Sequence, residues 1–175
     1  MEAGHEIVAL ANLYPPPGTE ELDSYMYQSV GHDVIEAYAD AMQLPLYRAP
    51  ITGTPRNLEY GYVPTEADEV EDLYNLLVRV QKDHPDLGGV SSGAILSSYQ
   101  KNRVECVCKR LGLESLAYLW QADQRSLLQS MIDAKLQAII IKVAAYGLDS
   151  GDLGKTLAEL QPKLHSLVAA PVCLF

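Results

Sequence analysis

The polar residues best suited to chemistry lie between Gly93 and Arg103, where the apolar string VSSGAIL runs into SSYQKNR. Ser97 and Gln100 have the spacing of a capping box and could simply close the start of a helix. The same helix start could instead offer backbone N–H groups to an anion, and Gly93 would let a ligand approach the backbone. The guanidinium of Arg103 suits a phosphate or carboxylate, or else a surface ion pair. We therefore predict a ligand pocket here.

A run of acidic residues from Asp68 to Asp72 is the second candidate for chemistry. One or two of its carboxylates could hold Mg²⁺. The first turn of a solvated helix, where the helix dipole favours negative charge, explains the same pattern and is the more frequent arrangement. Both interpretations place the start of a helix near Ala67.

Other metal or nucleophile patterns are weak. The four histidines are scattered, which argues against a zinc site or a catalytic triad. Cys106 and Cys108 would point about 200° apart on a helix and could not chelate one metal ion. The pair Gly154-Lys155 in LGKT lacks the upstream glycine of a P-loop. We predict no resident metal site.

The elements that must position these residues alternate between short apolar runs and longer amphipathic stretches, which is typical of βα units around a parallel sheet. The predicted strands are His5–Leu13, Leu44–Ile51, Val90–Leu96 and Ala138–Ala145, with a further short apolar run at Leu116–Trp120. The predicted helices cover Val30–Ala41, a stretch from Ala67 to about Val80, Ser98–Leu111, Ser126–Leu136 and Thr156–Leu167. Ligands of open parallel sheets bind beyond the carboxyl ends of the strands. The long loop Thr52–Ala67 and the start of the helix at Ser98 are therefore expected at the site.

Composition limits the classes of function. A chain of 175 residues with 48% hydrophobic and 21% charged residues is typical of one folded domain. A net charge of -10 repels a phosphate backbone and argues against nucleic acid as a partner. No segment approaches the roughly 20 apolar residues that span a bilayer, and no secretory leader is recognisable. With three cysteines, too few for a disulfide framework, these features predict a cytoplasmic protein that binds no membrane.

Several longer strings identify a family. ELDSYMYQSVGHD, LPLYR, DEVEDL, GAILSSYQKNRVECVCKRLGLESLAYLW and IIIKVAAYGLD with LGKTL together closely resemble the diphthine–ammonia ligase family, from about Gly4 to Leu164. The resemblance implies a doubly wound, mostly parallel α/β sheet of the adenine-nucleotide alpha-hydrolase-like, PP-loop ATPase type. It implies an incomplete domain over residues 1–168, without the family's first strand and S-G-G-K-D-S loop. Residues 169–175 would form a divergent apolar tail.

The resemblance also implies an activity. ATP, accompanied by Mg²⁺, would activate the carboxylate of diphthine on elongation factor 2, and ammonium would supply the nitrogen of the diphthamide amide. AMP and pyrophosphate would be released. The alternative is a non-catalytic isoform or fragment that binds substrate or nucleotide without turnover.

By the pattern of the family, two sets of residues would line the cleft. The nucleotide set is Gly93, Ala94, Ser97, Tyr99, Gln100 and Arg103. The substrate set is Met26, Gln28 and Glu69. The catalytic residues themselves are not assigned.

Overall fold

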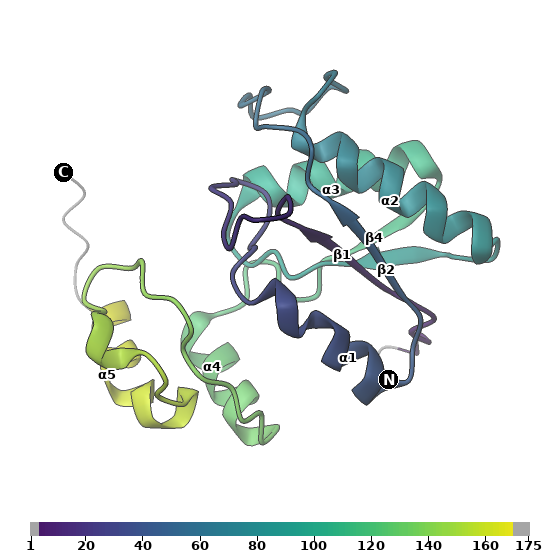
Figure 1. Cartoon of the computed structure of the whole chain (residues 1–175). Helices are drawn as coiled ribbons and strands as arrows, with labels where there is room; N and C mark the ends of the chain where they lie inside the picture. The colour runs from purple at the N-terminus through teal and green to yellow at the C-terminus, as the bar shows by residue number, and fades with distance from the viewer. Residues whose placement is uncertain (1–3, 170–175) are drawn as a thin grey trace. The chain divides into compact units, whose positions relative to one another are not determined.

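The computed structural model describes residues 4–169 and divides into two compact units between Trp120 and Gln121 (Figure 1). The first unit holds all the named strands of the described chain, and the second is built from helices and loops. The apolar tail expected at residues 169–175 lies outside the described residues, apart from its first residue at the end of the last helix.

The first unit begins with a parallel pair of strands. β1 (Leu10–Tyr14) pairs with β2 (Leu46–Pro50), and Leu10 lies opposite Leu46. The crossover between them contains the short helix η1 (His32–Val34) and α1 (Ile35–Met42), which ends where Gln43 takes a left-handed conformation. The strand predicted over residues 5–13 therefore starts five residues later than expected, because its ladder begins only where β2 supplies partners.

A second parallel pair follows. β3 (Gly89–Ser91) pairs with β4 (Glu114–Leu116) across α3 (Ser98–Leu111). The prediction for α3 is confirmed at both ends, and Gly112 closes it at φ 69°. The strand predicted to run to Leu96 is wrong beyond Ser91. The amide of Ser92 still donates to the carbonyl of Leu116, where β4 ends, so no partner remains for a longer ladder.

The helix α2 (Glu69–Asp83) joins the two pairs of strands, and Asp68 caps it by accepting a hydrogen bond from the amide of Val70. In Figure 1, α2 and α3 lie on one side of the strands and α1 lies on the other. Leu73 of α2 packs against all three clusters of the core. The buried members of these clusters are Met26, Val104, Cys108 and Leu113; Tyr62, Val70, Leu77 and Val107; and Leu13, Ile51 and Leu76. An α/β fold with parallel strands is thus confirmed.

The second unit contains α4 (Gln124–Asp133), η2 (Ser150–Asp152) and α5 (Leu157–Ala169). The buried strand predicted over residues 138–145 is wrong. This segment makes a single antiparallel bridge, between Ile139 and Thr156, and Ile139 and Ile141 are 53% and 58% exposed. An apolar run becomes a strand only where a neighbour pairs with it along its length, and here the pairing is confined to residues 138–140, opposite residues 154–157. In the described residues, no helix combines the length and the apolar character that crossing a bilayer requires.

Candidate functional site

The site is built around the first turn of α3, beyond the carboxyl end of β3. Ser97 caps this turn by accepting a hydrogen bond from the amide of Gln100 at 3.3 Å. The side chain of Gln100 turns away from the helix end and donates from Nε2 to the carbonyl oxygen of Met26 at 3.2 Å. Ser97 is thus a cap, while Gln100 joins the predicted nucleotide set to the predicted substrate set.

Met26 lies in a tight turn that is clamped onto the start of α2. The hydroxyl of Ser24 accepts hydrogen bonds from the amides of Met26 and Tyr27, at 3.0 and 2.8 Å. It donates its own proton to Oε2 of Glu69 at 2.6 Å. The Tyr27 hydroxyl donates to the backbone carbonyl of Glu69 at 2.9 Å, and burial raises its pKa. The side chain of Met26 itself is part of the core next to Val104.

Glu69 is a fully buried carboxylate with one oxygen that could still accept a hydrogen bond. Its side chain is 0% exposed, and Oε1 has no hydrogen-bond partner among the described residues. Burial raises the pKa of the carboxyl group, and the hydrogen bond from Ser24 acts in the opposite direction. An unpaired buried acceptor is costly for folding, so a group that supplies a proton or positive charge to Oε1 would relieve this cost.

Arg103 is buried and serves chiefly to hold backbone. Its Nη1 donates to the carbonyl of Tyr99 at 3.2 Å, and Nη2 donates to the carbonyls of Asn57 and Glu59 at 2.5 and 3.0 Å. The guanidinium lies 3.3 Å from the ring centroid of Tyr99 and 5.4 Å from that of Tyr62. Only Nε lacks a partner within the described structure. Arg103 therefore fixes the position of Tyr99 through its backbone carbonyl and its ring.

Tyr99 contributes the second unpaired group. Its hydroxyl is buried without a partner in the described chain, and its ring lies 5.8 Å from that of Tyr25. Burial raises the pKa of this hydroxyl, Arg103 lowers it, and the charge of Glu69 raises it. Ser92, just past β3, adds a third buried hydroxyl that finds no partner in the described residues.

The remaining predicted residues lie at different depths. Ala94 is buried at 5% exposure. Gly93 is exposed, and a Cβ added there would meet nothing within 4 Å, so it leaves open space beside the strand end. Gln28 is exposed, and the structure gives its side chain no hydrogen bond to the other members of the site.

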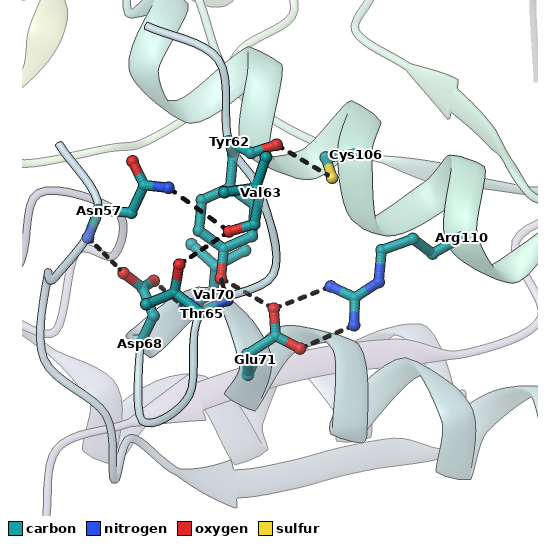
Figure 2. Close-up of polar contacts among 9 residues, drawn as sticks. All are labelled: Asn57, Tyr62, Val63, Thr65, Asp68, Val70, Glu71, Cys106 and Arg110. Atoms are coloured by element: carbon teal, nitrogen blue, oxygen red, sulfur yellow. Dashed lines mark hydrogen bonds and ion pairs between the residues drawn. The ribbon is translucent and has the colours of Figure 1, made fainter. Parts of the chain in front are cut away.

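The acids of the run are not simply a solvated helix face, because they accept hydrogen bonds from other parts of the protein. In addition to capping α2, Asp68 accepts a hydrogen bond from the amide of Asn57 (Figure 2). It also accepts one from the amide of Arg56. Asp72 accepts from the amides of Thr52 and Gly53 at 2.8 and 2.9 Å. These two carboxylates therefore anchor the loop that follows β2.

Glu71 completes the set by pairing with Arg110 through both oxygens, at 2.8 and 2.7 Å, as Figure 2 shows. Its Oε1 also accepts from the hydroxyl of Tyr62 at 2.8 Å. The ion pair is the main reason that the pKa of Glu71 is lowered. Within the run from Asp68 to Asp72, Glu69 is the acid with a buried oxygen that has no hydrogen-bond partner among the described residues.

Sequence reasoning missed Ser24, Tyr27 and Ser92. No local spacing connects Ser24 and Tyr27 to Glu69, because these contacts span 45 and 42 residues. Ser92 carries a usable signal, since it is a polar residue at the carboxyl end of a strand.

Comparison with known proteins agrees with this geometry. The diphthamide synthase N-terminal domain family matches residues 3–115, which include every residue of the site. The chain belongs to this family. Proteins named diphthine–ammonia ligase are 61% identical to it in Schizosaccharomyces pombe, 56% in Homo sapiens and 45% in Saccharomyces cerevisiae, over 95%, 95% and 99% of the chain. The chain spans 28%, 64% and 28% of these three relatives, respectively.

The match with the family ends close to the boundary between the two units. Residue 115 lies inside β4, and the first unit closes at Trp120. The similarity to the three relatives extends further and covers nearly the whole chain. Membership in the diphthamide synthase family thus rests on the unit that carries Glu69 and Tyr99.

Proposed function

We propose that the chain carries the site for ATP-dependent amidation of diphthine on elongation factor 2. In this reaction a carboxylate oxygen of diphthine attacks the α-phosphorus of ATP and pyrophosphate leaves. Ammonia then attacks the carbonyl carbon of the acyl-adenylate, AMP leaves, and a proton is lost to give the amide of diphthamide. Membership in the diphthamide synthase family and the printed names of the relatives support the proposal. It places the reaction in the cytoplasm, where elongation factors act.

The observation that carries the proposal is that Glu69, Tyr99 and Ser92, all in the first unit, each have a buried side-chain oxygen without a hydrogen-bond partner among the described residues. Native proteins rarely leave such groups unsatisfied, and those that do mark sites where another molecule completes the hydrogen bonds. An acceptor and two hydroxyl donors suit a ligand that is both cationic and rich in oxygen. Diphthine, with its trimethylammonium group, and ATP together have this chemistry.

Each residue then has a distinct role. The carboxylate of Glu69 faces the trimethylammonium group of diphthine, where opposite charges attract strongly away from water. The hydroxyl of Tyr99 and the free amides of the first turn of α3 donate to oxygens of the nucleotide. Arg103 acts as a positioning residue that fixes Tyr99 through its backbone carbonyl. Gln100 holds the turn at Met26 against α3.

The proposal includes the finer fold class. Two parallel pairs of strands with helical crossovers, and membership in the diphthamide synthase family, support an adenine-nucleotide alpha-hydrolase-like sheet of the PP-loop ATPase type. The Mg²⁺ that accompanies ATP would be bound mainly through the phosphates, because Asp68, Glu71 and Asp72 already accept protein hydrogen bonds.

The test is an amidation assay with the chain, ATP, Mg²⁺, ammonium and elongation factor 2 that carries diphthine. We expect release of AMP and pyrophosphate and conversion of the elongation factor, seen by mass spectrometry. Glu69→Gln and Tyr99→Phe should each lower AMP formation at least about tenfold, because each removes a group that contacts substrate.

Matched controls are Glu66→Gln and Tyr38→Phe, which change the same residue types at exposed positions. Both should keep the rate of the unsubstituted chain. If the chain bound elongation factor 2 but formed no AMP, the ligase proposal would give way to the alternative of a non-catalytic binding protein. Absence of both binding and AMP would refute the proposal.

A further inference from the structure

The loop Asn57–Val63, called the 57–63 loop below, is held by buried charged groups. Nη2 of Arg103 donates to the carbonyl oxygens of Asn57 and Glu59. The amide of Asn57 donates to the buried carboxylate of Asp68 at 2.9 Å (Figure 2). Hydrogen bonds to charged groups away from water are the strongest of their kind, so this loop has little conformational freedom.

The rest of the loop is tied to α2 and α3 in the same way. Asn102 donates from Nδ2 to the carbonyl oxygen of Tyr60 at 3.0 Å, and the thiol of Cys106 lies 3.7 Å from the carbonyl oxygen of Tyr62. The ring of Tyr62 points inward, is 8% exposed and reaches Glu71 with its hydroxyl (Figure 2). Tyr62 therefore anchors the middle of the loop in the core.

The other large apolar side chains of the loop are exposed. Leu58, Tyr60 and Val63 are 59%, 79% and 63% exposed. Folding gains little from three large apolar groups that stay in water, yet the backbone that presents them is fixed by Arg103 and Asp68. A rigid loop with an exposed apolar face is preorganised for contact with another surface, because little entropy is lost on binding.

We propose that the 57–63 loop is the docking surface for the protein that carries the diphthine side chain. The inference rests on the proposed function, in which the substrate is part of a folded protein and needs contacts outside the cleft. Arg103 makes the loop continuous with the site, since the same guanidinium holds Tyr99 and the loop. A protein seated on Leu58, Tyr60 and Val63 would thus lie directly beside Tyr99.

Charge defines the chemistry of this partner. Glu59 lies in the loop and Glu66 follows it, both exposed, whereas the exposed Arg56 precedes it, so acidic charge exceeds basic charge here, as in the whole chain with its net charge of -10. The complementary surface is therefore an apolar patch flanked by basic residues. The same charge opposes a second copy of this chain on the loop, because two such molecules repel each other.

The test combines Leu58→Ser, Tyr60→Ser and Val63→Ser in one variant. Calorimetry would measure its affinity for elongation factor 2 that carries diphthine, and separately for ATP. We expect binding of the elongation factor to weaken about tenfold or more, since tyrosine is enriched among the residues that carry the binding energy of protein interfaces and the surrounding apolar contacts exclude water. The affinity for ATP should stay within about twofold, because no substituted side chain belongs to the site.

The matched control is Val34→Ser with Tyr38→Ser and Val78→Ser, three apolar residues exposed by 59%, 59% and 42% in other elements. It should bind both ligands like the unsubstituted chain, and both triple variants should keep its melting temperature. Unchanged affinity of the loop variant for the elongation factor would overturn the docking surface and leave the proposed function intact. If light scattering showed the unsubstituted chain as a dimer and the loop variant as a monomer, the loop would be assigned to self-association instead. An unsubstituted chain that bound ATP but no elongation factor would overturn both proposals.

Discussion

At the residue scale, the defining feature is a buried cation, Arg103, that forms no ion pair with a carboxylate of residues 4–169. Arg103 is 0% exposed and contacts three backbone carbonyls and two aromatic rings, while its Nε has no partner in the described structure. Carbonyl dipoles and ring faces stabilise the positive charge of Arg103 because the N–H donors of a guanidinium group are held in a fixed, planar fork. The ammonium group of a lysine does not have this geometry. This geometry makes Arg103 hard to replace even by another cation.

Arg103→Lys should destabilise the first unit by about 3 kcal/mol, because a lysine cannot serve the carbonyls of Tyr99, Asn57 and Glu59 together. Urea unfolding followed by far-UV circular dichroism would measure the loss. Lys109→Arg, a change in the opposite direction at an exposed position, should alter stability by less than about 0.5 kcal/mol. Equal effects of the two substitutions would contradict the structural role given to Arg103.

Glu69 should make stability fall as pH rises. Its folded pKa is raised above 4.5, so the folded state binds the proton more tightly than the unfolded state. The contribution of Glu69 to the free energy of unfolding is therefore greatest below pH 4.5. It declines as the pH rises through the folded pKa of Glu69, by up to about 1.4 kcal/mol per pH unit.

Glu69→Gln tests this dependence, because the amide keeps an acceptor for Ser24 and cannot ionise. We expect the variant to lose the decline and to be more stable than the native chain at pH 8, as measured by urea midpoints between pH 5 and pH 8. Parallel curves for the two proteins would show that Glu69 does not titrate in this window.

At the element scale, the first turn of α2 holds the loop that follows β2 in place. Asp68 and Asp72 accept amide hydrogen bonds from that loop, and the amide of Glu69 donates to the carbonyl of Thr54. Gly53 lies so close that an added Cβ would be 2.5 Å from the backbone of Asp68 and Glu69. The loop and the helix therefore fold as one piece.

Gly53→Ala should cost about 2 kcal/mol, since the new methyl group meets backbone that cannot move aside without breaking these contacts. Gly88→Ala is the matched control, because its Cβ would meet nothing within 4 Å. It should be neutral or slightly stabilising through the reduced freedom of the unfolded chain. Thermal unfolding of the two variants would separate the effects, and similar melting temperatures would refute the close approach.

Local signals explain which elements could be predicted. α3 was predicted from Ser98 to Leu111 because a capping serine and a terminal glycine lie within its own sequence. The end of β3 and the absence of a strand over residues 138–145 depend on partners supplied by distant segments, which an apolar pattern does not reveal.

The same distinction applies to the site. The first turn of α3 was located from its residue types, and Gln100 contacts Met26 across 74 residues. The buried position of Arg103 and the separate roles of Asp68, Glu71 and Asp72 could not be read from spacing, because their partners lie in other elements. Whether the predicted residues bind ATP and diphthine stays a prediction.

At the scale of the whole molecule, the two units are held by different kinds of contact. The first has three apolar clusters, whereas the second is organised around Asp152 in η2. This buried carboxylate accepts hydrogen bonds from Lys163 at 2.5 Å, from Lys155 at 3.2 Å and from the amide of Asp149 at 3.1 Å. The second unit should therefore be the more sensitive to acid.

The hydrogen bond from Lys163 is the main cause that lowers the pKa of Asp152 from 3.8 to about 2. Asp152 therefore makes its full contribution to the stability of the folded state above pH 3.8, and this contribution is lost as the pH falls towards 2. Hydrogen exchange at pH 4 and pH 2.5, read by mass spectrometry, should show α5 losing protection before α2. Asp152→Asn should already weaken α5 at pH 7, whereas Asp133→Asn, at an exposed position, should not. Simultaneous opening of α2 and α5 would contradict this order.

The pairing of the strands has a practical consequence for solubility. β1 pairs with β2 and β3 with β4, so within the described chain each two-stranded sheet keeps outer edges whose amides and carbonyls can join strands of another molecule. Repulsion between chains of charge -10 opposes such contacts at neutral pH. This protection vanishes near the isoelectric point of about 4.7, where preparations should turn cloudy, and storage buffers well above that pH should keep them clear.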